Sequence, residues 1–203
     1  MGTVSRRPKG ELRERILAAT IDLLHERSDP ALVSIDAVVT AVGCTPPALY
    51  YYFPTKESLL SEACRIEYAA FAADLDAATP QSDDALSDLG ARGDAYITWA
   101  REHPAAYRHL FMTPLDVADD PPPIGPDGFP DLSGVPGLGS LVADLRRARE
   151  AGVPVGDPNL TAFALWGVVH GFASLAVTQP DMPHDWLVLG LERAYAGLLH
   201  GED

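Results

Sequence analysis

The sequence predicts an all-α protein, with an N-terminal three-helix head joined to a larger C-terminal helical bundle. Apolar side chains recur every three or four residues in successive segments from residue 11 onward, as they do on the buried face of a helix. Between residues 34 and 60, two short helical patterns flank a glycine-containing turn, which is typical of a helix-turn-helix. With 203 residues and a hydrophobic content of 47%, the chain can bury a sizeable core.

The first two helices of the head follow from periodicity and capping. From Glu11 to Arg27, one face carries the apolar or small residues Leu12, Ile16, Ala19, Thr20, Leu23 and Leu24. Ser34 is expected to cap the second helix through its hydroxyl group. Gly43 ends that helix because it accepts the left-handed conformation that a tight turn demands.

The third helix is expected to begin at Pro46 and Pro47, capped by Thr45, because the first turn of a helix does not need their missing N–H groups. Leu49 and Phe53 lie four residues apart and should pack on the first two helices. The three tyrosines between them, residues 50–52, occupy adjacent positions and cannot all face inward. This pattern predicts a helix that enters the major groove of DNA.

Charge is distributed in keeping with that prediction. The net charge is −14, yet the charges before Ser61 cancel, so the whole acidic excess lies after it. Near the N-terminus, basic residues predominate, namely Arg6, Arg7, Lys9, Arg13 and Arg15 against Glu11 and Glu14. This arm is either a soluble tail or a contact with the DNA backbone or minor groove. Lys56 begins the next helix, where the helix dipole disfavours a cation unless an anion such as a phosphate is near.

Six further helical segments are expected after the head, at residues 58–75, 84–102, 105–112, 137–150, 159–178 and 186–199. Residues 159–178 carry no charge and have the length of a membrane span. Because Gly167, His170, Gly171 and Ser174 interrupt the apolar run, we expect a helix buried on all sides and no membrane contact. Residues 113–136, rich in proline, glycine and aspartate, should be irregular, either as a lid over a pocket or as a disordered loop.

The last two helices carry the features of a dimer interface. Gly167 and Gly171 lie one turn apart on one helix face, with Ser174 nearby, so another helix can approach closely. Together with Leu187 and Leu191 of the final helix, they are expected to form a four-helix seam between two copies of the chain.

Several classes of site have no support in the sequence. Cys44 and Cys64 provide neither a disulfide framework nor a metal-ligand spacing, and the six histidines form no HxxxH or HExxH motif. We therefore expect no metal and no cofactor. A glycine-rich phosphate loop, a nucleophile elbow and paired catalytic carboxylates are also missing from the sequence, so an enzyme is not expected. The first residues lack the apolar run of a signal peptide, which favours a cytoplasmic protein.

Residues 34–60 resemble the DNA-binding signature of the tetracycline-repressor (TetR) family. The resemblance rests on the turn Val-Gly-Cys-Thr at residues 42–45, Ala-Leu-Tyr at 48–50, Tyr-Phe at 52–53 and Lys-Glu at 56–57, followed by Leu59 and Leu60. Residues 166–171, Trp-Gly-Val-Val-His-Gly, together with Tyr-Arg-His-Leu-Phe at 107–111, also resemble the ligand-binding domain of the Trp-His-Gly (WHG) subgroup. The resemblance implies a DNA-binding domain over residues 1–57 and a ligand-binding and dimerisation domain over residues 58–203.

The resemblance also implies site residues. The DNA-binding candidates are Ser34, Thr45, Pro46, Pro47, Ala48, Tyr50, Tyr51 and Lys56, with Arg6 and Arg7 from the arm. Because the tandem prolines donate no hydrogen bonds, base reading would depend on apolar contacts, for example with thymine methyl groups, and on DNA shape. The ligand-binding candidates are Trp99, Tyr107, Phe111, Trp166 and His170. Core packing is the alternative role for Trp166 and His170.

We therefore expect a ligand-responsive transcriptional regulator, a repressor in most members of the family. It would bind a pseudo-palindromic double-stranded DNA operator as a homodimer, and a small apolar effector would release it. One alternative is a ligand-binding adaptor or sequestering protein whose head binds protein rather than DNA. A helical enzyme that modifies a small molecule is the other.

Overall fold

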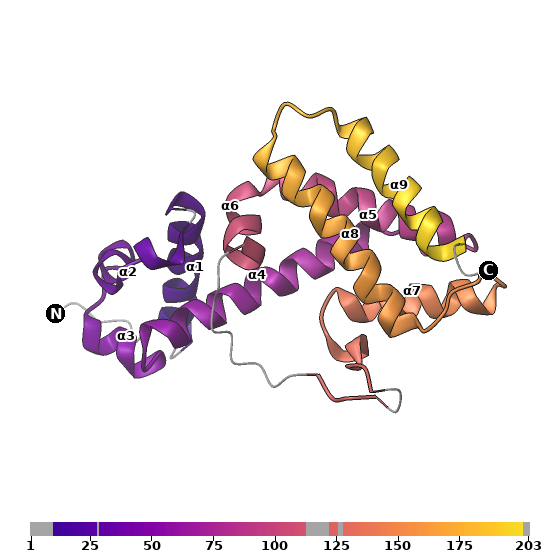
Figure 1. The fold of residues 1–203 in the computed structure, drawn as a ribbon. Helices are drawn as coiled ribbons and strands as arrows, with labels where there is room; N and C mark the ends of the chain where they lie inside the picture. Colours follow the sequence, from indigo (N-terminus) through magenta and orange to yellow (C-terminus); the bar gives the residue numbers. More distant parts are fainter. Residues whose placement is uncertain (1–9, 28, 113–121, 126–127, 201–203) are drawn as a thin grey trace. The chain divides into compact units, whose positions relative to one another are not determined.

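Helices account for the regular structure of the chain in the computed structural model, which describes residues 10–27, 29–112, 122–125 and 128–200. Within those residues the one β-type pairing is an isolated bridge between Ile124 and Pro130. The predicted all-α fold class is confirmed. The chain forms two compact units, one of Met1–Tyr68 with Ala105–Ala118 and the other of Ala69–Pro104 with Asp119–Asp203. Helix α4, Lys56–Ala78, passes from the first into the second (Figure 1).

The first unit contains the predicted three-helix head. Its elements are α1 (Glu11–Arg27), the 3₁₀ turn η1 (Pro30–Leu32), α2 (Ile35–Val42), α3 (Pro46–Tyr52), the start of α4, most of α6 (Pro104–Tyr107) and the π-helical turn η2 (Arg108–Met112). Ile16, Leu24 and Val38 form the centre of its core and are 0% exposed. Leu49 and Phe53 join the same core, as their spacing predicted.

The domain boundary expected after residue 57 falls inside the first turn of α4. The compact units divide later, after Tyr68. The reason lies in the first half of α4, whose apolar side chains Leu59, Leu60, Ala63 and Cys64 complete the core of the first unit. Polar and apolar residues alternate at helical spacing throughout this region, so the sequence pattern did not show where one core ends.

The second unit is a helical bundle. It consists of the end of α4, α5 (Ala85–Glu102), the 3₁₀ turn η3 (Leu132–Gly134), α7 (Leu138–Glu150), α8 (Pro158–Thr178) and α9 (His184–His200). Helix α8 packs against α5, α7 and α9. Two glycines allow α9 to approach its neighbours. A Cβ atom on Gly93 would lie 2.6 Å from Leu191 Cδ2, and one on Gly190 would lie 2.7 Å from Phe172 Cε1.

Charged side chains are buried in this bundle as a connected network. Arg92 of α5, with a side chain 6% exposed, pairs with Asp144 of α7 at 2.9 Å and with Asp76 of α4 at 2.8 Å. Arg147 of α7 pairs with Asp88 of α5 at 2.9 Å and with Asp144 at 3.0 Å. Because Asp88 and Asp144 are almost fully buried, these pairs satisfy charges that would otherwise be costly. They fix the register of α5 against α7.

Asp88 makes the stability of the bundle dependent on acid pH. Burial by itself raises the pKa of this carboxyl, but hydrogen bonds from Arg147 and Ser82 outweigh burial, and the net effect lowers the pKa below its usual value of 3.8. A lowered folded-state pKa contributes stability above the ordinary carboxyl pKa, and that stability is lost as the pH falls through the folded-state value. We expect the free energy of unfolding to fall below about pH 4 less steeply in Asp88→Asn than in the wild type. Urea unfolding between pH 3 and 7, with Asp83→Asn at an exposed position as control, measures this difference.

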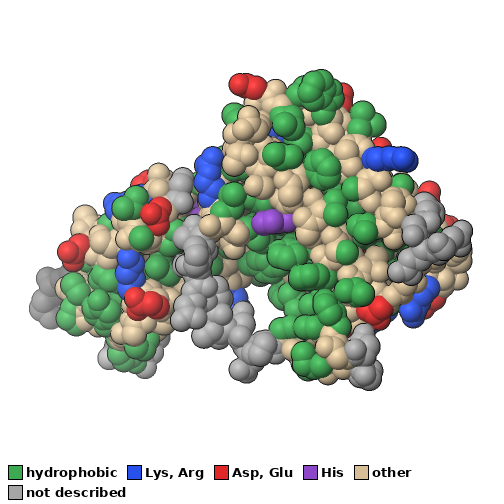
Figure 2. Space-filling view, viewed as in Figure 1, with side chains coloured by type: hydrophobic (Ala, Val, Ile, Leu, Met, Phe, Trp, Pro, Cys, Tyr) green, Lys and Arg blue, Asp and Glu red, His purple; other side chains and the backbone are tan. Residues whose placement is uncertain are grey.

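The expectation that residues 159–178 are buried on all sides is wrong for the single chain. Leu160, Phe163 and Leu175 are 54%, 48% and 42% exposed. They lie on the face of α8 that α5, α7 and α9 do not cover, and hydrophobic side chains gather over α8 in the view of Figure 2. Among the described residues α8 is long and apolar enough to cross a membrane, with a mean hydropathy of 1.7. Core helices of soluble proteins also pass this test.

The segment predicted to be irregular, residues 113–136, is described only in part. Residues 113–121 and 126–127 lie outside the described residues.

Candidate nucleic-acid interface

The helix-turn-helix has the local geometry that its sequence predicted, with one difference. Ser34 Oγ accepts a hydrogen bond from the N–H of Ala37 at 3.2 Å and so caps α2. Gly43 has φ 70° and ψ 42°, the left-handed conformation required by the turn. Thr45 has the extended backbone of an N-cap residue, but its hydroxyl makes no capping hydrogen bond. This exposed hydroxyl can therefore serve another acceptor or donor.

Helix α3 presents a polar aromatic surface next to its buried side. Leu49 is fully buried, while Tyr50 and Tyr51 are 44% and 70% exposed. Tyr52 instead packs partly against the head core and meets the edge of Tyr51, with ring centroids 5.1 Å apart. Two of the three tyrosines thus face solvent. The candidates Pro46 and Pro47 are exposed at the start of the helix, and Ala48 is half-buried.

Lys56 is held against the turn η1, which precedes α2. Thr55 and Ser58 cap α4 reciprocally, since the N–H of Ser58 donates to Thr55 Oγ1 at 3.0 Å and the N–H of Thr55 donates to Ser58 Oγ at 3.2 Å. Lys56 Nζ donates to the carbonyl of Ala31 in η1 at 3.2 Å. An ammonium group has three donors, so this contact orients the charge and leaves donors for a phosphate.

Two basic residues attributed to the arm make contacts within the first unit. Arg13 pairs with Glu62 at 2.8 Å and lies over the ring of Phe53, with its Cζ 5.3 Å from the ring centroid. Arg15 Nη2 donates to the carbonyl of Val42 at 2.5 Å. Both contacts join residues far apart in the sequence, which is why the sequence did not indicate them. The other arm candidates, Arg6 and Arg7, lie outside the described residues.

The five ligand-binding candidates are divided between the two units. Tyr107 and Phe111 belong to the first unit, whereas Trp99, Trp166 and His170 belong to the second. Trp166 stacks on His170 with centroids 5.4 Å apart, and Tyr96 Oη forms a hydrogen bond with His170 Nδ1 at 3.3 Å. Burial lowers the pKa of His170. These contacts favour the packing alternative for Trp166 and His170.

Trp99 does line a cavity. A groove of about 390 Å³ lies between α4 and α5, and its wall includes Trp99, His103 and three acidic residues, Asp74, Asp94 and Glu102. Trp99 itself is 9% exposed and packs on Phe71, with ring centroids 4.7 Å apart. Trp99 is therefore the predicted ligand-binding residue that contributes to this groove.

The predicted dimer residues divide into two groups. Gly167 and Gly171 are exposed, and an added Cβ atom at either would meet no atom within 4 Å; Ser174 is half-buried. Leu187 and Leu191 are 1% exposed and pack within their own bundle, so they offer little surface to a second copy of the chain. On α9 the exposed large apolar side chains are Trp186, Leu189 and Leu198, which are 68%, 62% and 45% exposed.

Comparisons with known proteins cover both units. Residues 16–63 match the model of a family described as bacterial regulatory proteins, tetR family, and residues 89–186 match a tetracyclin repressor-like C-terminal domain. HTH-type transcriptional regulators named EthR from Mycolicibacterium smegmatis and Mycobacterium tuberculosis are 39% and 37% identical over 59 residues. That stretch is 29% of this chain and 27% of each relative, so the match spans about a quarter of their length.

Solved structures with the same fold extend over nearly the whole chain. A protein from Rhodococcus sp. RHA1 superposes with a TM-score of 0.72 at 20% identity, covering 96% of this chain and 99% of that one. A tetR family transcription regulator from Shewanella sp. PV-4 gives 0.67 at 19% identity, with 94% and 97% covered. The fatty acid degradation regulator FadR from Bacillus halodurans gives 0.66 at 16% identity, with 96% and 98% covered. At these identities the likeness concerns the fold.

Proposed function

The chain belongs to the TetR family of bacterial transcriptional regulators, and from that premise we propose that it is a cytoplasmic, ligand-responsive repressor that binds a pseudo-palindromic operator as a homodimer. The observation that carries the proposal is the exposed surface of α3 and the start of α4. Thr45, Tyr50 and Tyr51 offer hydroxyl groups there, and Lys56 offers an ammonium group. Such groups contact phosphates and fix the register of a reading helix.

Base recognition in this proposal depends on apolar contacts and on DNA shape. Pro46 and Pro47 are exposed at the N-terminal end of α3, the end that helix-turn-helix proteins direct at base edges. Neither residue can donate a hydrogen bond through its backbone nitrogen. The net charge of −14 lies outside the head, so that the remaining surface disfavours contact with DNA.

A homodimer accounts for the uncovered apolar face of the second unit. Along α8, Leu160, Phe163, Gly167, Gly171 and Leu175 are exposed at intervals of three or four residues and lie on one face. We call this set the α8 stripe. Its two glycines allow close helix approach, and Trp186 and Leu189 of α9 add apolar area. A second copy of the chain that covers the α8 stripe would also supply the second head that a pseudo-palindromic operator requires.

The groove between α4 and α5 is the proposed effector site. Trp99 supplies an apolar wall, while Asp74, Asp94 and Glu102 supply negative charge. An apolar compound that carries a positive charge would match this lining better than an effector without charge. By linkage, an effector that releases DNA must bind the DNA-free form more tightly, by the same factor by which it weakens DNA binding.

Removal of the Lys56 ammonium or the Tyr50 hydroxyl tests the DNA-binding proposal. We expect Lys56→Ala to weaken binding of promoter DNA from beside the chain's own gene by about 5- to 20-fold. The slope of log K against the logarithm of the salt concentration should become less steep by about one. Tyr50→Phe should weaken binding by about 3- to 10-fold, because one hydrogen bond to a charged phosphate is lost. Fluorescence anisotropy at several salt concentrations measures both quantities.

The control is Arg193→Ala, which removes a cation from an exposed position on α9. It should leave DNA affinity unchanged. If Lys56→Ala and Tyr50→Phe both bind as tightly as the wild type, α3 does not dock as proposed. Salt-insensitive binding of a protein partner by the head would support the adaptor alternative instead.

A further inference from the structure

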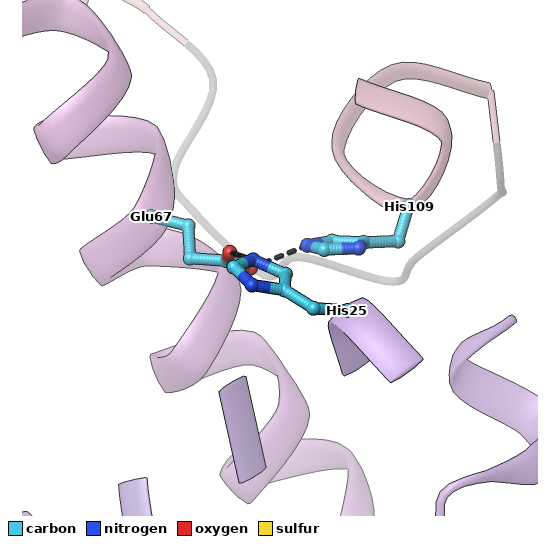
Figure 3. A group of neighbouring side chains, drawn as sticks. All are labelled: His25, Glu67 and His109. Carbon is cyan, nitrogen blue, oxygen red and sulfur yellow. Dashed lines mark hydrogen bonds and ion pairs between the residues drawn. The ribbon is translucent and has the colours of Figure 1, made fainter. Parts of the chain in front are cut away.

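Three polar side chains that are far apart in the sequence meet inside the first unit. His25 lies near the end of α1, Glu67 in α4 and His109 in η2. His25 Nε2 contacts Glu67 Oε1, and His109 Nε2 contacts Glu67 Oε2 (Figure 3). One ligand atom from each residue lies within 4.8 Å of the other two. Each histidine is 42 residues from the glutamate, so no short spacing motif could reveal the group.

Burial distinguishes this group from a surface ion pair. The side chain of His109 is 0% exposed and that of Glu67 is 8% exposed, whereas that of His25 is 44% exposed. The two imidazole rings are stacked, with centroids 5.8 Å apart and planes inclined by 26°, and both direct Nε2 toward the same carboxylate (Figure 3). A carboxylate buried to this degree requires compensating positive charge. The solvent-facing side of His25 provides a path by which a small cation can enter.

We propose that His25, Glu67 and His109 bind one divalent transition-metal ion, of which zinc is the reference case. Two imidazole nitrogens and one carboxylate oxygen form a donor set that suits first-row divalent metals and leaves coordination positions for water. Zinc bonds of about 2.0–2.2 Å set tetrahedral ligand atoms about 3.3 Å apart. The three groups already lie within 4.8 Å, so changes of side-chain rotamer bring them to that spacing. Magnesium and calcium prefer all-oxygen sites and fit poorly here.

The surroundings of His109 set the expected strength of the site. Metal binding through Nε2 leaves the ring proton on Nδ1, and Nδ1 of His109 has no hydrogen-bond partner among the described residues. Metal-binding histidines usually donate that proton to an acceptor, and loss of such a partner weakens affinity by about 10–100-fold. The site therefore binds its metal reversibly and exchanges it with the solution. It differs in this respect from a closed structural zinc site with four protein ligands.

Bound metal would join three elements of the first unit at one point. The ligands come from α1, α4 and η2, so binding stabilises the folded unit in proportion to metal concentration. This inference goes beyond the proposed function and does not depend on DNA binding. It also replaces the expectation from histidine spacing that the chain has no metal site.

Titration with cobalt(II) tests the proposal directly. The full chain, without a polyhistidine tag and stripped of metal, should bind one Co²⁺ per chain with the visible absorption of a nitrogen- and oxygen-ligated ion. Zn²⁺ should displace the Co²⁺, and Mg²⁺ in excess should not. Glu67→Gln keeps the size of the side chain and removes its charge, so we expect at least about 10-fold weaker binding. His25→Ala changes a largely exposed residue and should weaken binding comparably.

The matched control is His184→Ala. It removes a second histidine–carboxylate pair, in which His184 Nε2 lies 2.7 Å from Asp94 Oδ1 and both side chains are partly exposed. Binding should be unchanged in this variant. The proposal is overturned if the wild type shows no saturable one-to-one binding, or if Glu67→Gln and His25→Ala bind as the wild type does. Equal loss in His184→Ala would overturn it as well. Should Glu67→Gln unfold, as judged by circular dichroism, His25→Ala decides the question alone.

Discussion

Replacement of Gly171 by arginine should convert the proposed homodimer into a monomer and reduce affinity for the proposed operator by about 100-fold or more, because two linked heads bind far more tightly than one. Gly171 lies in the middle of the α8 stripe, and its position is open within the single chain. An arginine there would insert a charge and a long side chain into a contact that needs close helix approach. Sedimentation equilibrium measures the dimer, and anisotropy measures operator binding.

The substitution separates assembly from folding. In a helix interior arginine is more favourable than glycine by about 0.6–1 kcal/mol, so the variant helix has no intrinsic reason to unfold. Gly90→Arg on α5 is the control, since Gly90 is also helical and an added Cβ atom there meets nothing within 4 Å. It should remain dimeric. A Gly171→Arg protein that is dimeric and binds the operator normally would show that the α8 stripe is not the interface.

Replacement of Arg92 by methionine should destabilise the second unit by about 3–5 kcal/mol, because it leaves buried carboxylate charge without its partner. Asp144 is 2% exposed, and among the ion pairs of the described residues it would retain only the one with Arg147, at 3.0 Å. For a chain of this size the loss corresponds to a fall in Tm of about 6–20 °C. Thermal unfolding followed by circular dichroism measures it.

A double variant distinguishes lost charge pairing from lost packing. Adding Asp144→Leu to Arg92→Met removes the uncompensated charge, so the double variant should recover part of the stability that the single variant loses. Arg149→Met, at an exposed position near the end of α7, should change stability by less than about 0.5 kcal/mol. If the double variant is less stable than Arg92→Met alone, the volume of the side chains rather than their charge dominates.

Local signals in the sequence were sufficient for most of the helices. The first helix was expected from Glu11 to Arg27, and α1 has those bounds. Gly43 and Ser34 have the conformations that their residue types predicted. Caps and periodicity act over a few residues, so they can be read from the chain directly. The division of α4 between two cores could not be read, because it depends on which distant residues pack against each turn.

Part of the candidate site could be predicted because neighbouring residues of a helix cannot all face its core. Three consecutive tyrosines on a short helix had to include exposed ones, and Tyr50 and Tyr51 are exposed. The roles of Arg13 and Arg15 were not predictable, since their partners Glu62 and Val42 are 49 and 27 residues away. The contact of His25 and His109 with Glu67 was not predictable for the same reason, because these residues are also far apart in the sequence. Sequence patterns predict which face of a helix is buried. They do not predict which distant polar residues meet, because that depends on how the helices pack together.

The buried ion network of the second unit limits how relatives of this protein can diverge. Ion pairs connect four of its residues, namely Asp88, Arg92, Asp144 and Arg147. A change at one of these positions leaves a charge unpaired, so it becomes tolerable only after a compensating change at another. Mutations at these four sites are therefore epistatic and should accumulate in pairs. Asp74 and Glu102, at the surface of the groove, carry no such constraint in the described ion pairs. The ligand preference of the proposed effector site can therefore change by single steps while the bundle keeps its charges.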